Sequence, residues 1–321
     1  MAKKQTRVVG LGNALVDVVA SVDAEAIARH ALTPGGMHLV DRDAADALYA
    51  EVGPGLVQSG GSVANSIAHM RGLGLPCTFI GKVAPDTLGD AFAADLAALG
   101  VDFPALGPAD GAGTGRCVVL VTPDGERTMS TYLGAAQGLT PADVESGMPK
   151  DAALLLVEGY LWDSPQGAAM IDAAAARARA VGARIALTPS DAGCVQRHRD
   201  AMLAFIGDHC DILVGNHHEV GALAGNDSPE EALVWARRHA SIVAVTMSEA
   251  GALVADEERA YRIEAQPVER VVDTTGAGDA FAAGFLHGVL EGAPLPEAAR
   301  RGAELAARVI THPGAREQAA A

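Results

Sequence analysis

The chain has few cysteines, a deficit of basic residues and no long apolar run, and each shortage narrows the class of protein. The four cysteines lie far apart without a Cys-x-x-Cys pair, which excludes a disulfide framework and offers no zinc-site spacing. Lys and Arg number 24 against 40 Asp and Glu, so the net charge is 24 − 40 = −16 and we expect no nucleic-acid partner. The net charge does not exclude small anionic ligands, because local backbone dipoles can outweigh it.

No apolar stretch reaches 18 residues, and the N-terminus carries no apolar segment followed by a cleavage site. We therefore expect a soluble, cytoplasmic protein with no membrane partner. At 321 residues and 49% hydrophobic composition, the chain is long and apolar enough to bury a substantial core.

Strand-like and helix-like runs alternate over most of the chain. This alternation predicts an α/β fold, with a mostly parallel central sheet and helices on both faces. The predicted strands are 8–22, 77–83, 152–158, 183–188, 212–214 and 242–247. The predicted helices are 65–72, 90–99, 166–181, 199–207, 229–239, 277–291 and 295–311.

Two regions break this alternation. Residues 15–22 and 36–40 form one, and the other is a pair of β-rich runs, 116–122 and 127–133, joined by a Pro-Asp-Gly turn. They predict a small β-sheet that projects as a lid over the carboxyl ends of the parallel strands. No Ser/Pro-rich linker divides the chain, so we expect one domain over 1–321, with the lid built from about 14–41 and 114–134.

The strongest motif is Asp273-Thr-Thr-Gly-Ala-Gly-Asp279, which leads into an apolar helical run. Unpaired N–H groups at a helix start, with the positive end of the helix dipole, can hold an anion, and glycine permits close approach. Asp279 in the first turn has two interpretations. It is either a carboxylate stabilised by the dipole or a base for an attacking hydroxyl.

Two further segments near the N-terminus offer polar groups. Gly60 and Gly61 precede a predicted helix that carries Asn65 in its first turn, an arrangement that suits a polar ligand or a simple helix cap. The run that begins Gly10-Leu-Gly resembles a dinucleotide fingerprint but has Leu15 where the third glycine belongs. Asp17 in this apolar run needs partners when buried, and a sugar diol would supply two donors.

Together these motifs resemble the two signatures of the PfkB, or ribokinase-like, family of carbohydrate and nucleoside kinases. Gly60-Gly61 with Asn65 matches the first signature and the Asp273–Asp279 run the second, and the likeness extends from about residue 8 to 316. The shorter segments 12–18, 35–41, 126–135 and 158–162 look most like the adenosine kinase branch. The resemblance implies a ribokinase-like three-layer fold with a small β-sheet lid, and transfer of phosphate from ATP to a hydroxyl.

The resemblance also implies roles for individual residues. Asp279 would be the general base, and the N–H groups of Gly276, Ala277 and Gly278 would hold the transferred phosphoryl. Arg127 would reach the phosphates when the lid closes, or else is a solvated arginine of the hairpin. The nucleoside or sugar substrate would contact Asn13, Asp17, Gly60, Gly61 and Asn65. Its base would lie against Met37, Leu39, Tyr160 and Leu161, for which ordinary apolar packing is the alternative.

For ATP and Mg²⁺ the resemblance points to Asn216-x-x-Glu219, since hard Mg²⁺ prefers oxygen ligands and keeps several waters. ATP would also contact Thr246, Gly251, Thr275, Gly276 and Gly278. Some relatives bind K⁺, for which Asp273 and Thr275 match. The rival interpretation, a transition-metal site at His217, His218 and Glu219, is disfavoured because adjacent histidines seldom face the same way and because the sequence offers no obvious third ligand.

Ser248 departs from the family pattern, which has glycine there, so nucleotide contacts at this point are in question. The leading hypothesis is a kinase of the 5′-hydroxyl of a nucleoside, most of all adenosine, acting as a monomer or homodimer. The first alternative is a family kinase for ribose, fructose, guanosine or inosine. A non-catalytic binding regulator and a nicotinamide oxidoreductase are the remaining alternatives; the intact Asp279 and the missing third glycine at Leu15 argue against them.

Overall fold

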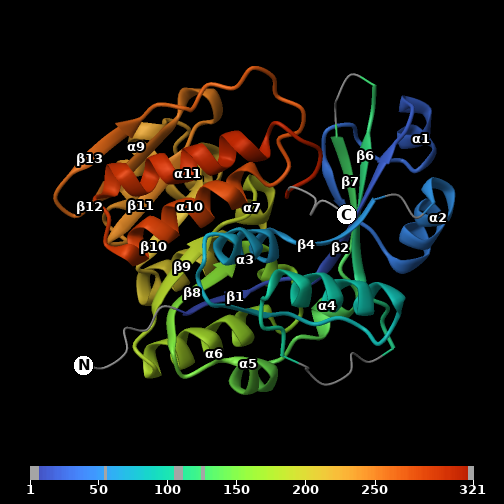
Figure 1. The fold of residues 1–321 in the computed structure, drawn as a ribbon, viewed down its shortest axis with the longest axis horizontal. Coiled ribbons are helices and arrows are strands. Elements are labelled where there is room, and N and C mark those ends of the chain that lie inside the picture. Colours follow the sequence, from blue (N-terminus) through green and yellow to red (C-terminus); the bar gives the residue numbers. More distant parts are fainter. Residues whose placement is uncertain (1–6, 54–55, 105–110, 124–126, 317–321) are drawn as a thin grey trace.

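The computed structural model describes residues 7–53, 56–104, 111–123 and 127–316, and it folds into two sheets with helices around them (Figure 1). The strands are β1 (Arg7–Leu11), β2 (Leu15–Ser21), β3 (Met37–Leu39), β4 (Leu56–Gly60), β5 (Cys77–Ile80), β6 (Gly115–Val121), β7 (Arg127–Tyr132), β8 (Ala152–Glu158), β9 (Arg184–Thr188), β10 (Ile212–Asn216), β11 (Ile242–Thr246), β12 (Ala252–Asp256) and β13 (Ala260–Ile263). The α-helices are α1 (Ala24–Arg29), α2 (Arg42–Val52), α3 (Ser62–Gly72), α4 (Thr87–Leu99), α5 (Pro141–Gly147), α6 (Gly167–Ala180), α7 (Ala192–His209), α8 (His217–Ala224), α9 (Pro229–Ala236), α10 (Ala277–Glu291) and α11 (Leu295–Val309).

An eight-stranded sheet forms the body of the molecule, in the order β13-β12-β11-β10-β9-β8-β1-β5. The strands from β11 to β5 are parallel, and β12 runs antiparallel to both of its neighbours. The predicted α/β fold with a mostly parallel central sheet is therefore confirmed.

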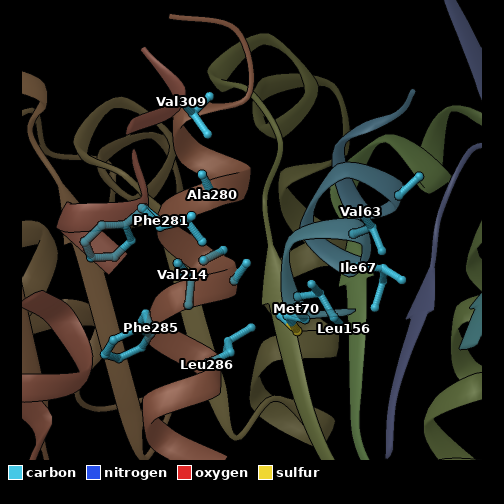
Figure 2. Packing of buried hydrophobic residues seen from close by; sticks show 14 of the residues in the cluster. Val63, Ile67, Met70, Leu156, Val214, Ala280, Phe281, Phe285, Leu286 and Val309 are labelled. Atoms are coloured by element: carbon cyan, nitrogen blue, oxygen red, sulfur yellow. The ribbon is translucent and has the colours of Figure 1, made fainter. Parts of the chain in front are cut away.

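Alternate side chains along each strand point to opposite faces of this sheet. Val8 joins one hydrophobic cluster and its neighbour Val9 joins the other. Helices α3, α4, α10 and α11 cover the first face, and α5 to α9 cover the second, which gives three layers. Figure 2 shows the first cluster, where Val63 and Ile67 of α3 approach the side of α10 that carries Ala280 and Leu286. This packing fixes the starts of α3 and α10 relative to each other.

A second, five-stranded sheet has the order β3-β7-β6-β2-β4 and stands beside the body (Figure 1). Strands β6 and β7 form the predicted antiparallel hairpin, with Arg116 opposite Tyr132; its turn, 124–126, lies outside the described residues. Strand β4, which the sequence did not predict, pairs antiparallel with β2. Because β4 runs directly into α3, this small sheet is joined to the body at the Gly60-Gly61 segment.

Several predicted boundaries differ from the structure, and three of them have a local physical reason. Helix α3 begins at Ser62 rather than 65, after Gly61 at a φ of 97°. Helix α7 begins at Ala192, where the Asp191 side chain accepts a hydrogen bond from the Cys194 N–H at 2.8 Å, and the predicted start at 199 follows a kink at the non-helical residue His198. Strand β5 ends at Ile80 rather than 83, because its partner β1 ends at Leu11, directly opposite.

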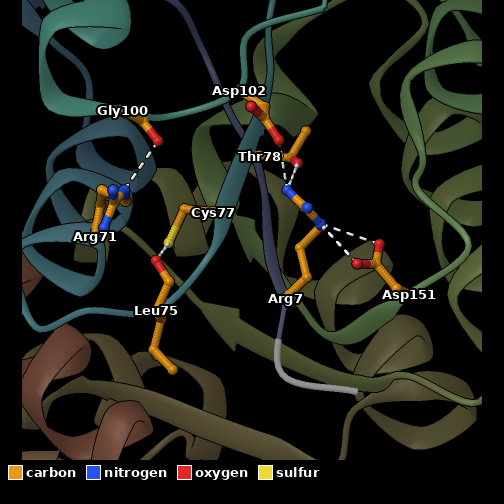
Figure 3. Close-up of polar contacts among 8 residues, drawn as sticks. All are labelled: Arg7, Arg71, Leu75, Cys77, Thr78, Gly100, Asp102 and Asp151. Carbon is orange, nitrogen blue, oxygen red and sulfur yellow. Dashed lines mark hydrogen bonds and ion pairs between the residues drawn. The ribbon is translucent and has the colours of Figure 1, made fainter. Parts of the chain in front are cut away.

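Arg7 fixes the first residue of the central strand β1. Its guanidinium donates to Asp151 at 3.0 Å and to Thr78 at 3.3 Å, and it also pairs with Asp102 (Figure 3). These exposed pairs contribute little stability each, but they tie three chain segments to one point.

All four cysteines are buried free thiols. Burial raises the pKa of Cys77, Cys117 and Cys210 to about 12, and the pKa of Cys194 rises as well. Within the described ranges, no helix combines the length and the apolar character needed to cross a bilayer.

Candidate active site

The start of helix α10 leaves backbone N–H groups without partners. Its N-cap is Gly276, with a φ of 74° and no side-chain cap. The N–H groups of Gly276 and Gly278 donate to no residue that the structure describes, whereas the Ala277 N–H already donates to the Thr274 carbonyl at 3.2 Å. A Cβ on Gly276 would lie 2.6 Å from the Cβ of Ala315, so only glycine fits this turn. The free N–H groups and the helix dipole favour an anion here.

Asp279 lies in the first turn of α10 and faces the start of α3. The Ser62 hydroxyl donates to its Oδ1 at 2.6 Å. Burial raises the pKa of Asp279 to about 6, and side-chain hydrogen bonds from Ser62 and Asn65 partly oppose that rise. A carboxylate with such a pKa is ionised near neutrality and is still basic enough to accept a proton from a hydroxyl.

Asp17 stands on β2 against the backbone of Gly60. A Cβ on Gly60 would lie 2.1 Å from the Asp17 carboxyl carbon, so glycine is required for this approach. Burial raises the pKa of Asp17 to about 7, the charge of Arg316 opposes the rise, and Asp279 adds to it. Nothing in the described part of the chain donates a hydrogen bond to this carboxylate. The partners that an aspartate needs in an apolar strand must therefore come from elsewhere.

Glu158, at the end of β8, is a residue that the sequence did not assign to the site. Its carboxylate accepts hydrogen bonds from the Asn13 N–H at 2.8 Å, from the Asn13 side-chain amide at 2.9 Å and from the Val63 N–H at 3.0 Å. Burial raises the pKa of Glu158 to about 7 despite these bonds. The buried side-chain oxygens of Asn13 and Asn65 have no partner among the described residues. Both are predicted substrate contacts, and both still offer an acceptor.

Asn216 and Glu219 begin helix α8 with reciprocal hydrogen bonds. The Asn216 oxygen accepts from the Glu219 N–H at 2.9 Å, and Glu219 accepts from the Asn216 N–H at 3.0 Å and from its amide at 2.6 Å. Burial raises the pKa of Glu219 to about 8, and the charges of Asp191 and Asp279 contribute. This concentration of negative charge suits a divalent cation. Among the described residues no three His, Cys, Asp or Glu side chains are placed to hold one directly, so Mg²⁺ would keep its waters.

The rings of His217 and His218 lie 3.8 Å apart, centre to centre, at an interplanar angle of 39°. The expectation that these neighbouring side chains would point apart is therefore wrong. The two rings contact each other in a tilted arrangement at the start of α8.

Arg127 of β7 reaches from the small sheet to the Asp273–Asp279 motif. Its guanidinium donates to Asp273, Thr274 and Thr275, so it is not a solvated hairpin arginine. Asp273 also accepts from the N–H groups of Thr275 at 2.7 Å and Gly314 at 2.8 Å. Although burial opposes it, these bonds and Arg127 lower the pKa of Asp273. Arg127 thus balances the charge of Asp273 in this arrangement, and a K⁺ ion at Asp273 and Thr275 stays a prediction.

The predicted base contacts divide into two groups. Met37 is half-buried and Leu39 is 47% exposed on β3, the edge strand of the small sheet, where a ligand could reach them. Tyr160 lies close to Asp191, and burial first, then the charge of Asp191, raises the pKa of the Tyr160 hydroxyl further above its usual value. Leu161 is completely buried in the hydrophobic cluster under the second face of the large sheet. Its side chain offers no surface to a ligand, so the prediction that it contacts a base is wrong.

The predicted nucleotide contacts Thr246 and Gly251 flank a sharp turn after β11. Thr246 lies opposite Asn216 in the strand register, at the same edge of the sheet. Gly251 has a φ of 85°, and a Cβ there would lie 2.0 Å from the Ile263 carbonyl. Ser248 between them has a left-handed φ of 53°, a conformation that glycine adopts without strain. This explains the glycine of the family pattern.

An open helix start, an ionised base beside it and nearby amide oxygens without a described partner can bind a phosphoryl donor and a polyhydroxy acceptor. The sequence matches the pfkB family carbohydrate kinases over residues 40–320, so the chain belongs to this family. It is therefore a phosphotransferase that acts on a hydroxyl group of a sugar or nucleoside.

Solved structures with the same fold include two that are 38% identical to this chain. A probable sugar kinase from Rhizobium etli has a TM-score of 0.92, with 99% of this chain and 96% of that one covered. An adenosine kinase from Sinorhizobium meliloti has a TM-score of 0.90, with 98% and 97% covered. Among characterised sequences, the guanosine-inosine kinase of Escherichia coli is 30% identical over 71% of this chain, which spans 56% of that protein's length.

Proposed function

We propose that this chain is an adenosine kinase, which transfers the γ-phosphoryl group of ATP to the 5′-hydroxyl of adenosine and gives AMP and ADP. The observation that supports this proposal most is Asp17. No described residue donates a hydrogen bond to its carboxylate, and it lies close enough to the base Asp279 to be influenced by its charge. A ribose diol supplies two donors to one carboxylate and directs the 5′-hydroxyl to the second. The Sinorhizobium meliloti adenosine kinase, 38% identical along nearly its whole length, supports this acceptor.

In the proposed reaction, Asp279 takes the proton from the 5′-hydroxyl as its oxygen attacks the γ-phosphorus. The N–H groups of Gly276 and Gly278 stabilise the charge that develops on the phosphoryl oxygens, and Arg127 closes the site from the small sheet. Asn216 and Glu219 would hold Mg²⁺ through water, and this ion would neutralise the ATP phosphates. Thr246, Gly251 and Thr275 would contact ATP, and Met37, Leu39 and Tyr160 would surround the base.

A panel of acceptors tests this proposal. The purified chain is incubated with ATP, Mg²⁺ and adenosine, guanosine, inosine, ribose or fructose in turn, and ADP formation is measured. We expect the highest kcat/KM with adenosine; no transfer to adenosine would reject this acceptor. Guanosine and inosine are the second candidates, because the relative of that name is 30% identical. AMP as product would place the reaction in purine salvage, in the cytoplasm where ATP is abundant.

A further inference from the structure

Arg316, near the C-terminal end of the described chain, is a buried arginine whose bonds lead toward the acceptor site. It is only 6% exposed. Its Nη2 donates to the carbonyl of Ser59 and, at 2.8 Å, to the Ser59 hydroxyl, and it pairs with Asp95 at 3.1 Å. Asp95 also accepts from the Ser59 N–H at 3.1 Å. Ser59 is therefore held on both sides, by a cation and by an anion.

Ser59 is the residue immediately before Gly60, whose backbone lies against the carboxylate of Asp17. The charged or titratable groups that act on Asp17 are Arg316, Asp279 of α10 and the thiol of Cys117 of β6. Asp279 is an anion and the thiol is neutral, since its pKa is raised to about 12. Within the described chain, Arg316 is the one cation that favours the charged form of Asp17.

The residues just before Arg316 contact the other half of the site. The Gly314 N–H donates to Asp273 at 2.8 Å, Ala315 lies against Gly276, and the carbonyl of Ala315 bonds to His69 of α3 at 3.0 Å. The segment 314–316 thus touches the loop that faces the phosphoryl group and the loop that supports Asp17.

We propose that Arg316 is a positioning residue of the acceptor site, which fixes the Ser59-Gly60 edge beneath Asp17 and supplies the countercharge for that carboxylate. The proposal rests on the assignment of Asp17 to the acceptor, and it does not depend on which base or sugar the acceptor carries. It extends the site to a residue outside both family signatures.

The test is the pH dependence of kcat/KM for the acceptor in Arg316→Met, compared with wild type. Losing a nearby opposite charge raises a carboxylate pKa by about one unit or more. We expect the acidic limb of kcat/KM, near pH 7 in wild type, to move up by about one unit. At pH 7, where half of Asp17 is ionised in wild type and about a tenth would be in the variant, we expect kcat/KM to fall about fivefold, mostly through KM. The acidic limb of the pH profile of kcat, which Asp279 governs, should not move, because Arg316 does not influence the pKa of Asp279.

Arg308→Met is the matched control. Arg308 lines a surface cavity together with Arg316 and is exposed, but its guanidinium makes no hydrogen bond or ion pair with the described residues. We expect wild-type kinetics from it. An unmoved limb and an unchanged KM in Arg316→Met would overturn the proposal, and so would an equal shift in Arg308→Met.

Arg316→Lys keeps the proposal testable if the methionine variant does not fold. Lysine retains the charge but cannot hold the Ser59 carbonyl and Asp95 together with a planar fork. We expect KM for the acceptor to rise several-fold, while the acidic limb of kcat/KM stays within about 0.3 pH unit of wild type. An unchanged KM would contradict the positioning role of Arg316. Should adenosine fail as acceptor, the same measurements use whichever acceptor the panel identifies, so the two failures remain separate.

Discussion

Helices α10 and α8 show two ways to begin a helix beside the active site. Helix α8 closes its own start, because the side chains of Asn216 and Glu219 satisfy each other's backbone N–H groups. Helix α10 starts on Gly276 with no side-chain cap, and two of its first N–H groups have no described partner. A cap typically contributes about 1 kcal/mol to stability. The missing cap at α10 therefore indicates a start kept open for a ligand, and the capped start of α8 places a carboxylate instead.

The largest effect on activity is expected from Asp279, the base in the first turn of α10. Asp279→Asn removes the proton acceptor but keeps a side chain that can bond to Ser62, so kcat should fall about 10²- to 10⁴-fold with little change in fold. Steady-state ADP formation and a thermal melt of the same sample measure both. Near-normal turnover would show that the open helix start works without this carboxylate.

The pH profile of kcat sharpens the same point. Burial raises the pKa of Asp279 to about 6, and a base must be ionised to accept a proton. Below pH 6 the fraction ionised falls tenfold per unit, so kcat at pH 5 should be about a tenth of its plateau. The profile is recorded at saturating ATP and acceptor. A plateau that extends to pH 4.5 would exclude Asp279 as the group that limits the rate.

At the capped start, Glu219→Gln tests whether the carboxylate does more than cap. The amide cannot accept from both the Asn216 N–H and its side chain, so we expect a stability loss of about 1 kcal/mol. Losing the charge should also raise the Mg²⁺ concentration for half-maximal activity about tenfold, read from a Mg²⁺ titration.

Glu231→Gln is the matched control for that titration. Glu231 occupies the same third position of helix α9, where Ser228 accepts a hydrogen bond from its N–H, and it is exposed. Its Mg²⁺ titration should superimpose on that of wild type. If the two glutamine variants behave alike, the acidic start of α8 is only a cap.

The smallest expected effect is on stability, and it distinguishes a glycine at the start of α10 from a glycine at its end. Gly276 and Gly292 both have left-handed φ values, 74° and 78°. A Cβ on Gly276 would clash with Ala315, whereas nothing lies within 4 Å of one on Gly292. Gly292→Ala should cost about 1 kcal/mol of unfolding free energy, and Gly276→Ala clearly more, in denaturant melts. If both substitutions lower the free energy of unfolding equally, segment 314–316 moves aside without cost and the close packing at Gly276 is not required.

The sequence predicted well what is contiguous in the chain. The Asp273–Asp279 motif and the hairpin strands carry their signals within a few residues, and the structure has both. Helix α2 was missed although Asp41 caps it, accepting from the Ala44 N–H at 2.9 Å. Asp41 followed by this Ala-rich segment is therefore a usable signal for a helix start.

Contacts between distant segments could not be predicted. Ser62 meets Asp279 across 217 residues, Glu158 meets Asn13 across 145, and Arg316 meets Ser59 across 257. No periodicity links such positions, because the sheet order alone brings them together. The misplacement of Leu161 has the same origin, since a short apolar run does not reveal which side chain faces the core.

The burial of the four cysteines has a practical consequence for following motion. Their protonated thiols, held away from solvent, react slowly with alkylating reagents, since the thiolate is the nucleophile. We therefore expect thiol-reactive dyes to label the native protein very little. A single cysteine introduced at the exposed Leu39 would carry one fluorophore on β3 without altering any other position, and its emission would report how the surroundings of β3 change as substrates bind.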